Sequence, residues 1–168
     1  AIEGNGFFQM RLSNGEMAYT RSGSFTLNSL GQMVNHDGNP LEPAVTIPPG
    51  AETVTIGTDG TISITVPGQA ASQEIGQIQI VQFVNSAGLL AKGRSYYQPT
   101  SASGPAVPGI PGATGSGLGT IAQGSLEGSN VRVVEEMVEL ITGQRAFEMN
   151  SKVISTADRI LQSTTNLK

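Results

Sequence analysis

His36 is the only histidine of the chain and the first residue to consider for chemistry. It stands beside Asp37-Gly38, a dipeptide typical of turns, and no second metal ligand lies near it in the sequence. General-base catalysis and zinc binding both need several side chains that converge on one point. The chain has no cysteine, which excludes disulfide bonds and thiolate metal sites. We therefore expect His36 to be structural or exposed, and we predict no metal site.

Three glutamates, Glu135, Glu136 and Glu139, are the densest group of carboxylates. Paired carboxylates serve acid–base chemistry when their surroundings push their pKa values apart. Here they fall near the start of a predicted helix and on its polar side, where negative charge interacts favourably with the helix dipole. This position predicts a solvated helix face.

A glycine-rich run, 115–119, resembles a phosphate-binding loop only superficially. It follows no convincing strand, opens no helix and has no lysine behind it. Ser22, Ser103 and Ser116 each lack the strand–turn–helix context of an activated serine. We predict no catalytic residue, no cofactor and no small-molecule substrate, and hence a chain that is not an enzyme.

The charge of the chain limits its partners. Nine Lys and Arg against thirteen Asp and Glu leave a net charge of −4, and the basic residues are scattered. A nucleic-acid binder or a protein that adheres to anionic membranes would show a basic patch. The sequence has no apolar run near the roughly 20 residues of a membrane span and no signal peptide, so we expect no direct membrane insertion. Only 13% of the residues are charged, which favours a surface partly covered by neighbours.

Residues 1–100 have the pattern of short strands separated by turns. Phe8, Met10 and Leu12 alternate with polar residues, and Asn14-Gly15 then predicts a hairpin with a type I′ turn. The run 75–84 is the longest strand candidate, with a bulge expected where its apolar phase slips between Ile80 and Val81. The pattern predicts a mainly β domain, rich in glycine turns, that forms a sandwich or a partly open barrel.

Three further segments follow the β-domain. Residues 101–119 are dominated by Ser, Ala, Gly and Pro, which predicts a loop without regular structure. Residues 120–131 are expected to return to the β-domain. In 132–168 the apolar period changes from two to about 3.6, which predicts a C-terminal amphipathic helix roughly 50 Å long.

This helix needs a partner. Gly143 costs roughly 1 kcal/mol relative to Ala, and several Ser and Thr lower the helix propensity further, so packing must supply most of the stability. We expect the β-domain, another helix or another copy to supply that surface. Tyr96-Tyr97 could belong to the core edge or to a contact between subunits. The predicted assembly interface consists of Val133, Val134, Met137, Val138, Leu140, Ile141, Phe147, Ile154 and Leu161.

Three separated motifs carry a family resemblance. They are the runs 1–8 with 19–25, 123–131 with 135–138, and 144–152. Together they resemble the bacterial flagellar rod and hook proteins, the axial family of the flagellum. The residues of these motifs that we single out are Gly4, Gly6, Phe7, Phe8, Tyr19, Arg21, Gly23, Phe25, Ser129, Asn130, Val131, Gln144, Arg145 and Asn150.

The resemblance implies a structural subunit that polymerises helically into the drive shaft of the flagellum. Such proteins leave the cell through the flagellum's own export apparatus, and their C-terminal helix packs with an N-terminal helix, which the resemblance places before Ala1. Its expected partners are copies of itself and neighbouring proximal rod, hook and ring proteins, in the basal-body rod that spans the periplasm. The family usually has Asn or Asp just before the helix, where this chain has Arg132, so Ser129 or Asn130 is expected to cap an earlier helix start.

Three functions follow as hypotheses. The modest size of the β-domain, together with 46–48 and Gln123-Gly124, favours a subunit of the distal rod. A hook or proximal rod subunit is the alternative within the family. A secreted β-sandwich hydrolase or carbohydrate-binding module is the alternative from another class, and it would require a carboxylate pair, an aromatic platform or a pocket of convergent polar groups.

Overall fold

The computed structural model describes residues 1–68 and 71–165, with side chains for all of these except 163–165. The chain divides into two compact units, which we call the β-unit (Ala1–Glu127) and the helical unit (Gly128–Lys168). The β-unit consists of short antiparallel strands, and the helical unit holds one long helix. The predicted fold class, mainly β with a long C-terminal helix, is confirmed.

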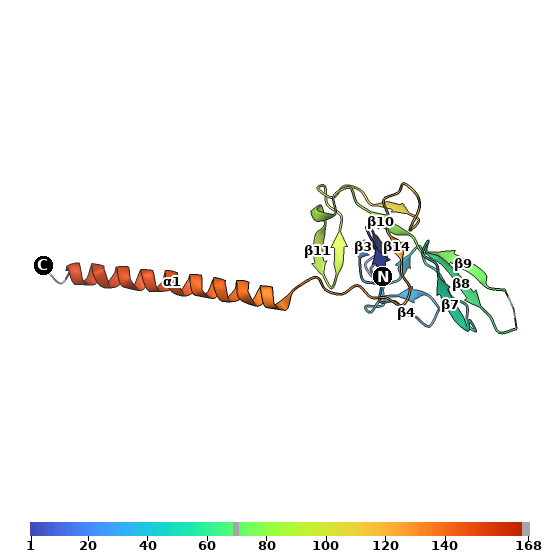
Figure 1. Cartoon of the computed structure of the whole chain (residues 1–168), viewed down its shortest axis with the longest axis horizontal. Helices are drawn as coiled ribbons and strands as arrows, with labels where there is room; N and C mark the ends of the chain where they lie inside the picture. Colours follow the sequence, from blue (N-terminus) through green and yellow to red (C-terminus); the bar gives the residue numbers. More distant parts are fainter. Residues whose placement is uncertain (69–70, 166–168) are drawn as a thin grey trace. The chain divides into compact units, whose positions relative to one another are not determined.

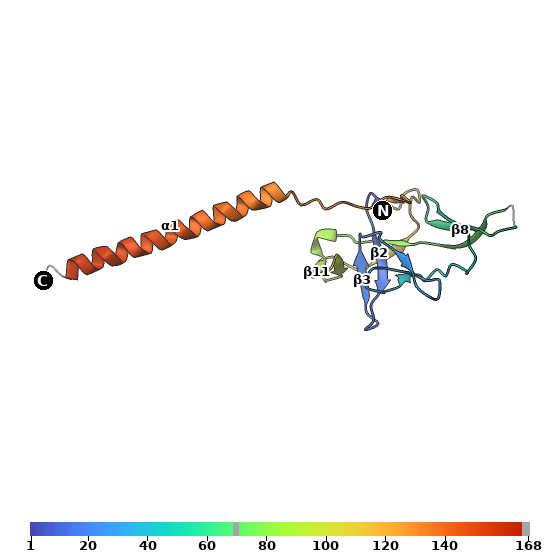
Figure 2. The ribbon, with the colours of Figure 1, turned by 90° about the horizontal axis from the view of Figure 1, so that it is seen from below.

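An open antiparallel sheet forms the centre of the β-unit. Its strand order is β11-β12-β3-β2-β10-β13, and β6 pairs with β2 outside this path. The strands β2 and β3 lie side by side (Figure 2) and occupy the middle of this strand order. The strands of this sheet are β2 (Phe7–Arg11), β3 (Met17–Thr20), β6 (Leu41–Glu42), β10 (Ile80–Gln82), β11 (Leu90–Gly93), β12 (Tyr96–Gln98) and β13 (Val107–Gly109).

Three smaller sheets complete the β-unit. They are β1 (Ile2–Glu3) with β14 (Thr120–Ile121), β4 (Thr26–Leu27) with β5 (Met33–Val34), and β7 (Thr53–Ile56) with β8 (Thr61–Thr65) and β9 (Gln73–Gln77). A short 3-10 turn, Ser86–Gly88, precedes β11. The β7–β9 sheet and the β11–β12 hairpin lie at opposite ends of the unit (Figure 1). Among the described residues the strands close no barrel.

Aliphatic side chains from several sheets form one core. Met10 and Leu41 from the central sheet meet Ile62 and Ile64 of β8, and all four are almost completely buried. Apolar residues of β2 and β8 alternate in burial along their strands, as the period of two predicts. The core therefore joins the β7–β9 sheet to the central sheet.

The hairpin predicted at Asn14-Gly15 is present between β2 and β3, but its turn is of another type. Gly15 has a φ of 83°, whereas Asn14 is not in the positive-φ region, and the Gly15 amide donates to the Leu12 carbonyl at 2.9 Å. This is a type I turn closed by a left-handed glycine, so the predicted type I′ turn is wrong here. The chain places positive φ at two successive positions in Arg94 and Ser95, which join β11 to β12.

The long strand predicted over 75–84 is also wrong. The chain forms β9 as far as Gln77 and resumes as β10 at Ile80, in a different sheet. The Ile78 amide still donates to the carbonyl of Gly60 at 2.8 Å, one position beyond the Thr61–Gln77 pair, and the chain passes to the central sheet at Ile80. The shift of apolar phase marked this change of sheet and not a bulge.

The segment 101–119 contains a strand that composition did not predict. β13 pairs with β10 across the register pairs Ile80–Gly109 and Gln82–Val107. Pro111 and Ser103 in the same segment are fully buried. Proline and glycine are tolerated here because β13 is an edge strand.

The helix α1 spans Val133–Thr165. The Ser129 hydroxyl accepts a hydrogen bond from the Val131 amide at 3.2 Å, ahead of the helix, so the predicted earlier helix start is wrong. Arg132 instead forms an ion pair with Glu135 at 2.9 Å, across the first turn.

Candidate assembly site

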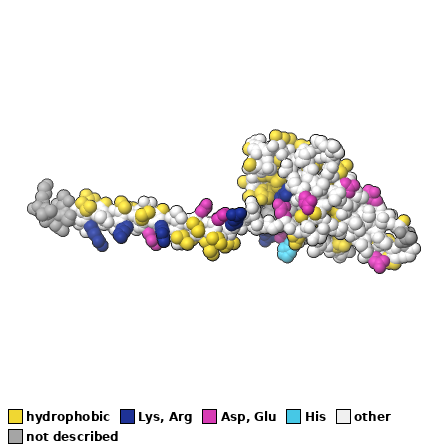
Figure 3. Space-filling model, viewed as in Figure 1, with side chains coloured by type: hydrophobic (Ala, Val, Ile, Leu, Met, Phe, Trp, Pro, Cys, Tyr) yellow, Lys and Arg dark blue, Asp and Glu magenta, His cyan; other side chains and the backbone are white. Residues whose placement is uncertain are grey.

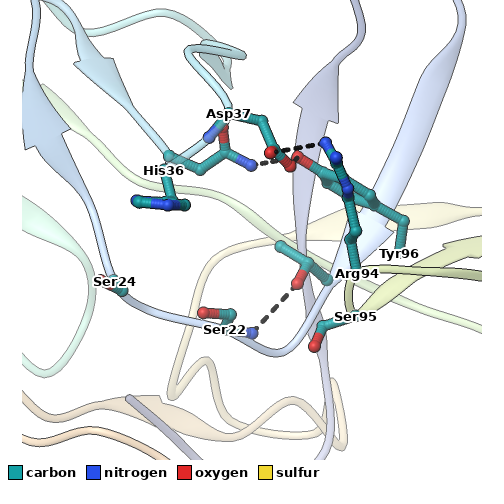
Figure 4. Close-up of a pocket in the computed structure, with 9 residues that line it drawn as sticks. Ser22, Ser24, His36, Asp37, Arg94, Ser95 and Tyr96 are labelled. Atoms are coloured by element: carbon teal, nitrogen blue, oxygen red, sulfur yellow. Dashed lines mark hydrogen bonds and ion pairs between the residues drawn. The ribbon is translucent and has the colours of Figure 1, made fainter.

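A polar pocket of about 340 Å³ lies at the turn of the β11–β12 hairpin and contains His36 (Figure 4). Asp37 is the one carboxylate among its lining residues, and both of its oxygens are engaged. Arg94 donates to one oxygen at 2.9 Å and the Tyr96 hydroxyl donates to the other at 2.9 Å. The amide side chains of Asn35 and Asn39 also donate to the Tyr96 hydroxyl.

This arrangement holds a hairpin to a turn, and Asp37 is engaged by Arg94 and Tyr96. A hydrolase site would need a second carboxylate or a free base beside His36. Tyr96 is buried, so its hydroxyl must find partners inside the protein, and the turn at 35–39 provides them. Of the two roles left open for the tyrosines, Tyr96 therefore belongs to the core edge.

Arg21 lies where the first and last residues of the β-unit come together. Its guanidinium donates to the carbonyls of Gly4 at 2.7 Å and Gly6 at 2.9 Å, and to that of Ile2 at 3.3 Å. It also binds both carboxylate oxygens of Glu127, at 3.0 and 3.3 Å. One side chain thus joins the first residues of the unit to its last residue. We call Ile2, Gly4, Gly6, Arg21 and Glu127 the neck cluster.

Backbone pairing reinforces the neck cluster. β1 and β14 are antiparallel with Ile2 opposite Ile121, and the Ala122 amide donates to the Ala1 carbonyl at 2.9 Å. A Cβ placed on Gly4, whose φ is 104°, would come within 3.0 Å of the Cα of Gly119. The glycine of the first family motif is therefore required by its backbone conformation and by the close approach of two chain segments.

Gln123 ties the outgoing segment to the β7–β9 sheet. Its side-chain amide donates to the Val54 carbonyl at 2.9 Å, and its oxygen accepts from the Ile56 amide at 2.8 Å. These two bonds reproduce the pattern of a β-ladder along the free edge of β7. The Gln123-Gly124 motif thus has a structural role that spacing alone did not show.

The aromatic residues of the family motif pack beside the neck cluster. Phe7 lies edge-to-face with Phe83, with ring centroids 5.7 Å apart, and Phe8 lies in the same way against Phe25 at 5.0 Å. Tyr19 packs on Phe83 at 4.9 Å, and burial raises the pKa of its hydroxyl. Gly23 leaves little room for a side chain, because a Cβ there would lie 3.2 Å from the Ala1 nitrogen.

The apolar residues of α1 are exposed. Met137 is 60% exposed and Phe147 is 76% exposed, values that core residues never reach. All nine predicted interface residues belong to this exposed set. Their role in assembly stays a prediction, and its physical basis is that contiguous exposed apolar surface marks an interaction site.

The prediction also missed residues of the second half of the helix. Met149, Val153 and Ile160 are exposed apolar side chains that line one shallow groove with Thr156 and Ala157. They were overlooked because only the heptad spacing from Leu140 was followed. Plotting every residue at about 100° per position would have found them.

The remaining motif residues lie in the helical unit. Ser129, Asn130 and Val131 precede α1, and Gln144, Arg145 and Asn150 lie within it; all are exposed. Across residues 1–68 and 71–165 no group of acidic, histidine or cysteine side chains could hold a metal ion. No helix in the described part of the chain is long and apolar enough to cross a membrane.

Comparisons with known proteins give consistent matches at both ends of the chain. Residues 1–64 match the flagellar hook protein FlgE/F/G D1 domain, and residues 122–167 match the flagellar basal body rod FlgEFG protein C-terminal family. These two segments contain the neck cluster and α1.

Individual relatives match over nearly the whole chain. It is 47% identical to the flagellar basal-body rod protein FlgG of Buchnera aphidicola subsp. Schizaphis graminum, over 99% of this chain and 64% of that protein. It is 46% identical to FlgG of Caulobacter vibrioides, over 100% of this chain and 63% of that protein. The chain thus spans less than two thirds of the length of these relatives. The flagellar hook protein FlgE of Escherichia coli is 39% identical over 58% of this chain and 24% of that protein.

Proposed function

Because this chain belongs to the flagellar hook and basal-body rod family, we propose that it forms part of a structural subunit of the distal rod, which assembles into the axial drive shaft and carries motor torque to the hook. The observation that carries the proposal is the similarity to FlgG over 99% of the chain, against 58% for the hook protein. The subunit would reside in the basal body, where the rod spans the periplasm. It would leave the cell through the flagellum's own export apparatus.

Self-assembly is the proposed mechanism. The exposed apolar residues of α1 supply the surface that neighbouring copies would cover, and many identical contacts in a lattice add up even when each is weak. Copies of the same chain are the main partners, with proximal rod, hook and ring proteins at the ends and sides of the rod.

The neck cluster suits a part that transmits torque. Arg21 and Gln123 hold the incoming and outgoing segments to the body of the β-unit, so a force on either segment reaches the core without bending a free linker within 1–127. A flexible connection at this point would absorb rotation instead of passing it on.

Deleting the gene in the source bacterium tests the proposal. We expect isolated basal bodies to end short of the distal rod in electron micrographs and the cells to lack hooks, with both restored by the intact gene. Labelled protein should lie in the rod segment below the hook. Complete rods in the deletion strain would overturn the proposal, and label along the hook would favour the hook alternative.

A further inference from the structure

The sulfur chemistry of this chain belongs to its methionines. The sequence has five methionines and no cysteine, so thioethers are the sulfur groups that an oxidant can attack. The five are Met10, Met17, Met33, Met137 and Met149. A hydroperoxide oxidises a thioether to a sulfoxide, which turns a flexible apolar side chain into a polar one. The exposure of each side chain therefore decides where the protein is open to this modification.

The β-unit protects its three methionines. Met10 is fully buried and Met33 is 8% exposed, and both belong to the main core. Met17 is half-buried against the aromatic cluster around Tyr19, and its sulfur accepts a hydrogen bond from the Gln9 side-chain amide at 3.6 Å. An oxidant therefore reaches Met10 and Met33 only when the β-unit opens.

Both methionines of α1 are exposed. Met137 is 60% exposed and Met149 is 65% exposed. Hydrophobic side chains lie open along the helix, and basic side chains accompany them in its second half (Figure 3). Met149 lies 12 positions after Met137. This spacing places the two residues roughly 18 Å apart along the helix axis and about 120° apart around it, so their surroundings differ.

The surroundings of Met137 are apolar on every side. Residues three and four positions away are neighbours on the surface of a helix. For Met137 these are Val133, Val134, Leu140 and Ile141. A sulfoxide oxygen at this position is a strong acceptor, and aliphatic side chains have no donor to offer it. When another surface covers this cluster, the oxygen is buried without a partner, which is costly.

The surroundings of Met149 include two basic side chains. Its neighbours at three and four positions are Arg145, Ala146, Lys152 and Val153. Lys152 also lines the same shallow groove as Met149. Guanidinium and ammonium groups are donors that can bond a sulfoxide oxygen. Oxidation at Met149 therefore leaves the new oxygen beside charged donors, whereas oxidation at Met137 does not.

From this contrast, and resting on the proposed function, we propose that oxidation of Met137 to the sulfoxide blocks assembly of the free subunit. A hydroperoxide transfers one oxygen atom to the Met137 sulfur, so that an S–O bond forms, the O–O bond breaks and the peroxide leaves as water or an alcohol. The sulfur loses two electrons and the peroxide gains them. Methionine sulfoxide reductases reverse this modification in proteins generally, so the block is reversible.

The same reaction does not reach the assembled protein. Neighbours that cover α1 in a rod also cover the Met137 sulfur, so a peroxide no longer has access to it. Met137 is therefore sensitive before assembly and protected afterwards. An oxidised subunit is kept out of the rod, while the subunits already in place stay intact.

Peptide mapping by mass spectrometry tests the sites of oxidation. The purified full-length protein is treated with dilute hydrogen peroxide under native conditions, and the gain of one oxygen atom is timed at each methionine. We expect Met137 and Met149 to react at similar rates, at least roughly tenfold faster than Met10 and Met33, because buried sulfurs react only from opened states. A Met137 that reacts no faster than Met10 in the folded protein would overturn the inference.

Light scattering then measures the effect of oxidation on association of the full-length protein. Each variant is compared with its own unoxidised form. Oxidation should weaken association of the natural protein and of Met149→Leu by roughly tenfold or more, because an unpaired polar atom is buried, and it should affect Met137→Leu much less. Leucine has a similar volume and cannot form a sulfoxide. Methionine sulfoxide reductase should restore association of the oxidised natural protein.

The variants separate the possible outcomes. Equal losses for oxidised Met137→Leu and the oxidised natural protein would overturn the inference, and so would unchanged association of natural protein that is fully oxidised at Met137. A loss that Met149→Leu prevents and Met137→Leu does not would overturn it as well. Unoxidised full-length protein that stays monomeric would instead refute self-assembly, the proposed mechanism on which the inference rests.

Discussion

Replacing Arg21 with alanine removes the side chain that joins both ends of the β-unit. The guanidinium donates to three backbone carbonyls and to both oxygens of Glu127. The substitution leaves those carbonyls without their donor and frees the segment from Ile2 to Gly6 to open. We expect the β-unit to stay folded but to lose stability.

The magnitude follows from the geometry. Hydrogen bonds from a charged donor contribute about 1.5–3 kcal/mol each, but Arg21 is 27% exposed and water can replace some of them. We therefore expect Arg21→Ala to lower the free energy of unfolding by about 2–3 kcal/mol. Glu127→Gln removes only the ion pair, whose carboxylate is 41% exposed, and should cost about 0.5–1 kcal/mol. Arg21→Lys should lie between them, because an ammonium cannot reach all these acceptors.

Urea unfolding measured by tyrosine fluorescence gives the three values, since the chain has no tryptophan to mask the signal. Hydrogen exchange then locates the change. In Arg21→Ala the Ala122 amide, which donates to Ala1, should exchange faster, while amides of the β2–β3 ladder keep their protection. An Arg21→Ala stability within about 0.5 kcal/mol of Glu127→Gln would show that the carbonyl contacts contribute little, and would refute this account of the neck cluster.

Three further predictions concern other parts of the chain. Gly143→Ala should stabilise α1 by about 1 kcal/mol, because alanine has the higher helix propensity and nothing lies within 4 Å of the new Cβ. The melting temperature of the helical circular dichroism signal should therefore rise, and a lower melting temperature would contradict this. Tyr96→Phe should cost about 1–3 kcal/mol in urea unfolding because its asparagine and aspartate partners lose a buried hydroxyl, whereas the matched Tyr97→Phe should be nearly neutral. The Asp59 carboxyl should titrate with a pKa below its usual value, because the Thr61 hydroxyl and amide donate hydrogen bonds to the carboxylate, and NMR measures this pKa. Because the pKa of Asp59 is lower in the folded state than in the unfolded state, the carboxylate stabilises the fold at pH values above its unfolded-state pKa. That stability is lost as the pH falls through the folded-state pKa, and an ordinary pKa for Asp59 in the folded protein would contradict the assignment.

Local signals in the sequence predicted the elements but not their connections. The alternation of Phe8 and Met10 identified β2, and the change to a period of 3.6 identified α1, although the cap expected at Ser129 or Asn130 set its start too early. The strand at 107–109 was not predicted from the sequence, because its proline and glycine are tolerated only at the edge of a sheet. That edge position depends on pairing with β10. The break after Ile78 was not predicted for a similar reason, since the residues from Ile80 onward pair with the distant strands β2 and β13.

The candidate site was predicted in part. Nine exposed apolar residues of the helix were identified by their spacing, but Met149, Val153 and Ile160 were missed because only the heptad line from Leu140 was followed. The motif residues around Arg21 were recognised by resemblance alone. Their physical role depends on Glu127, more than a hundred positions away, and no local pattern could show that pairing.

The pairing of β1 with β14 makes the β-unit a self-contained module. Its first and last residues meet, so the unit can be inserted between two neighbouring positions of a host chain with little cost in loop closure. It should also be graftable into the surface loop of an unrelated carrier, where it would fold as it does here.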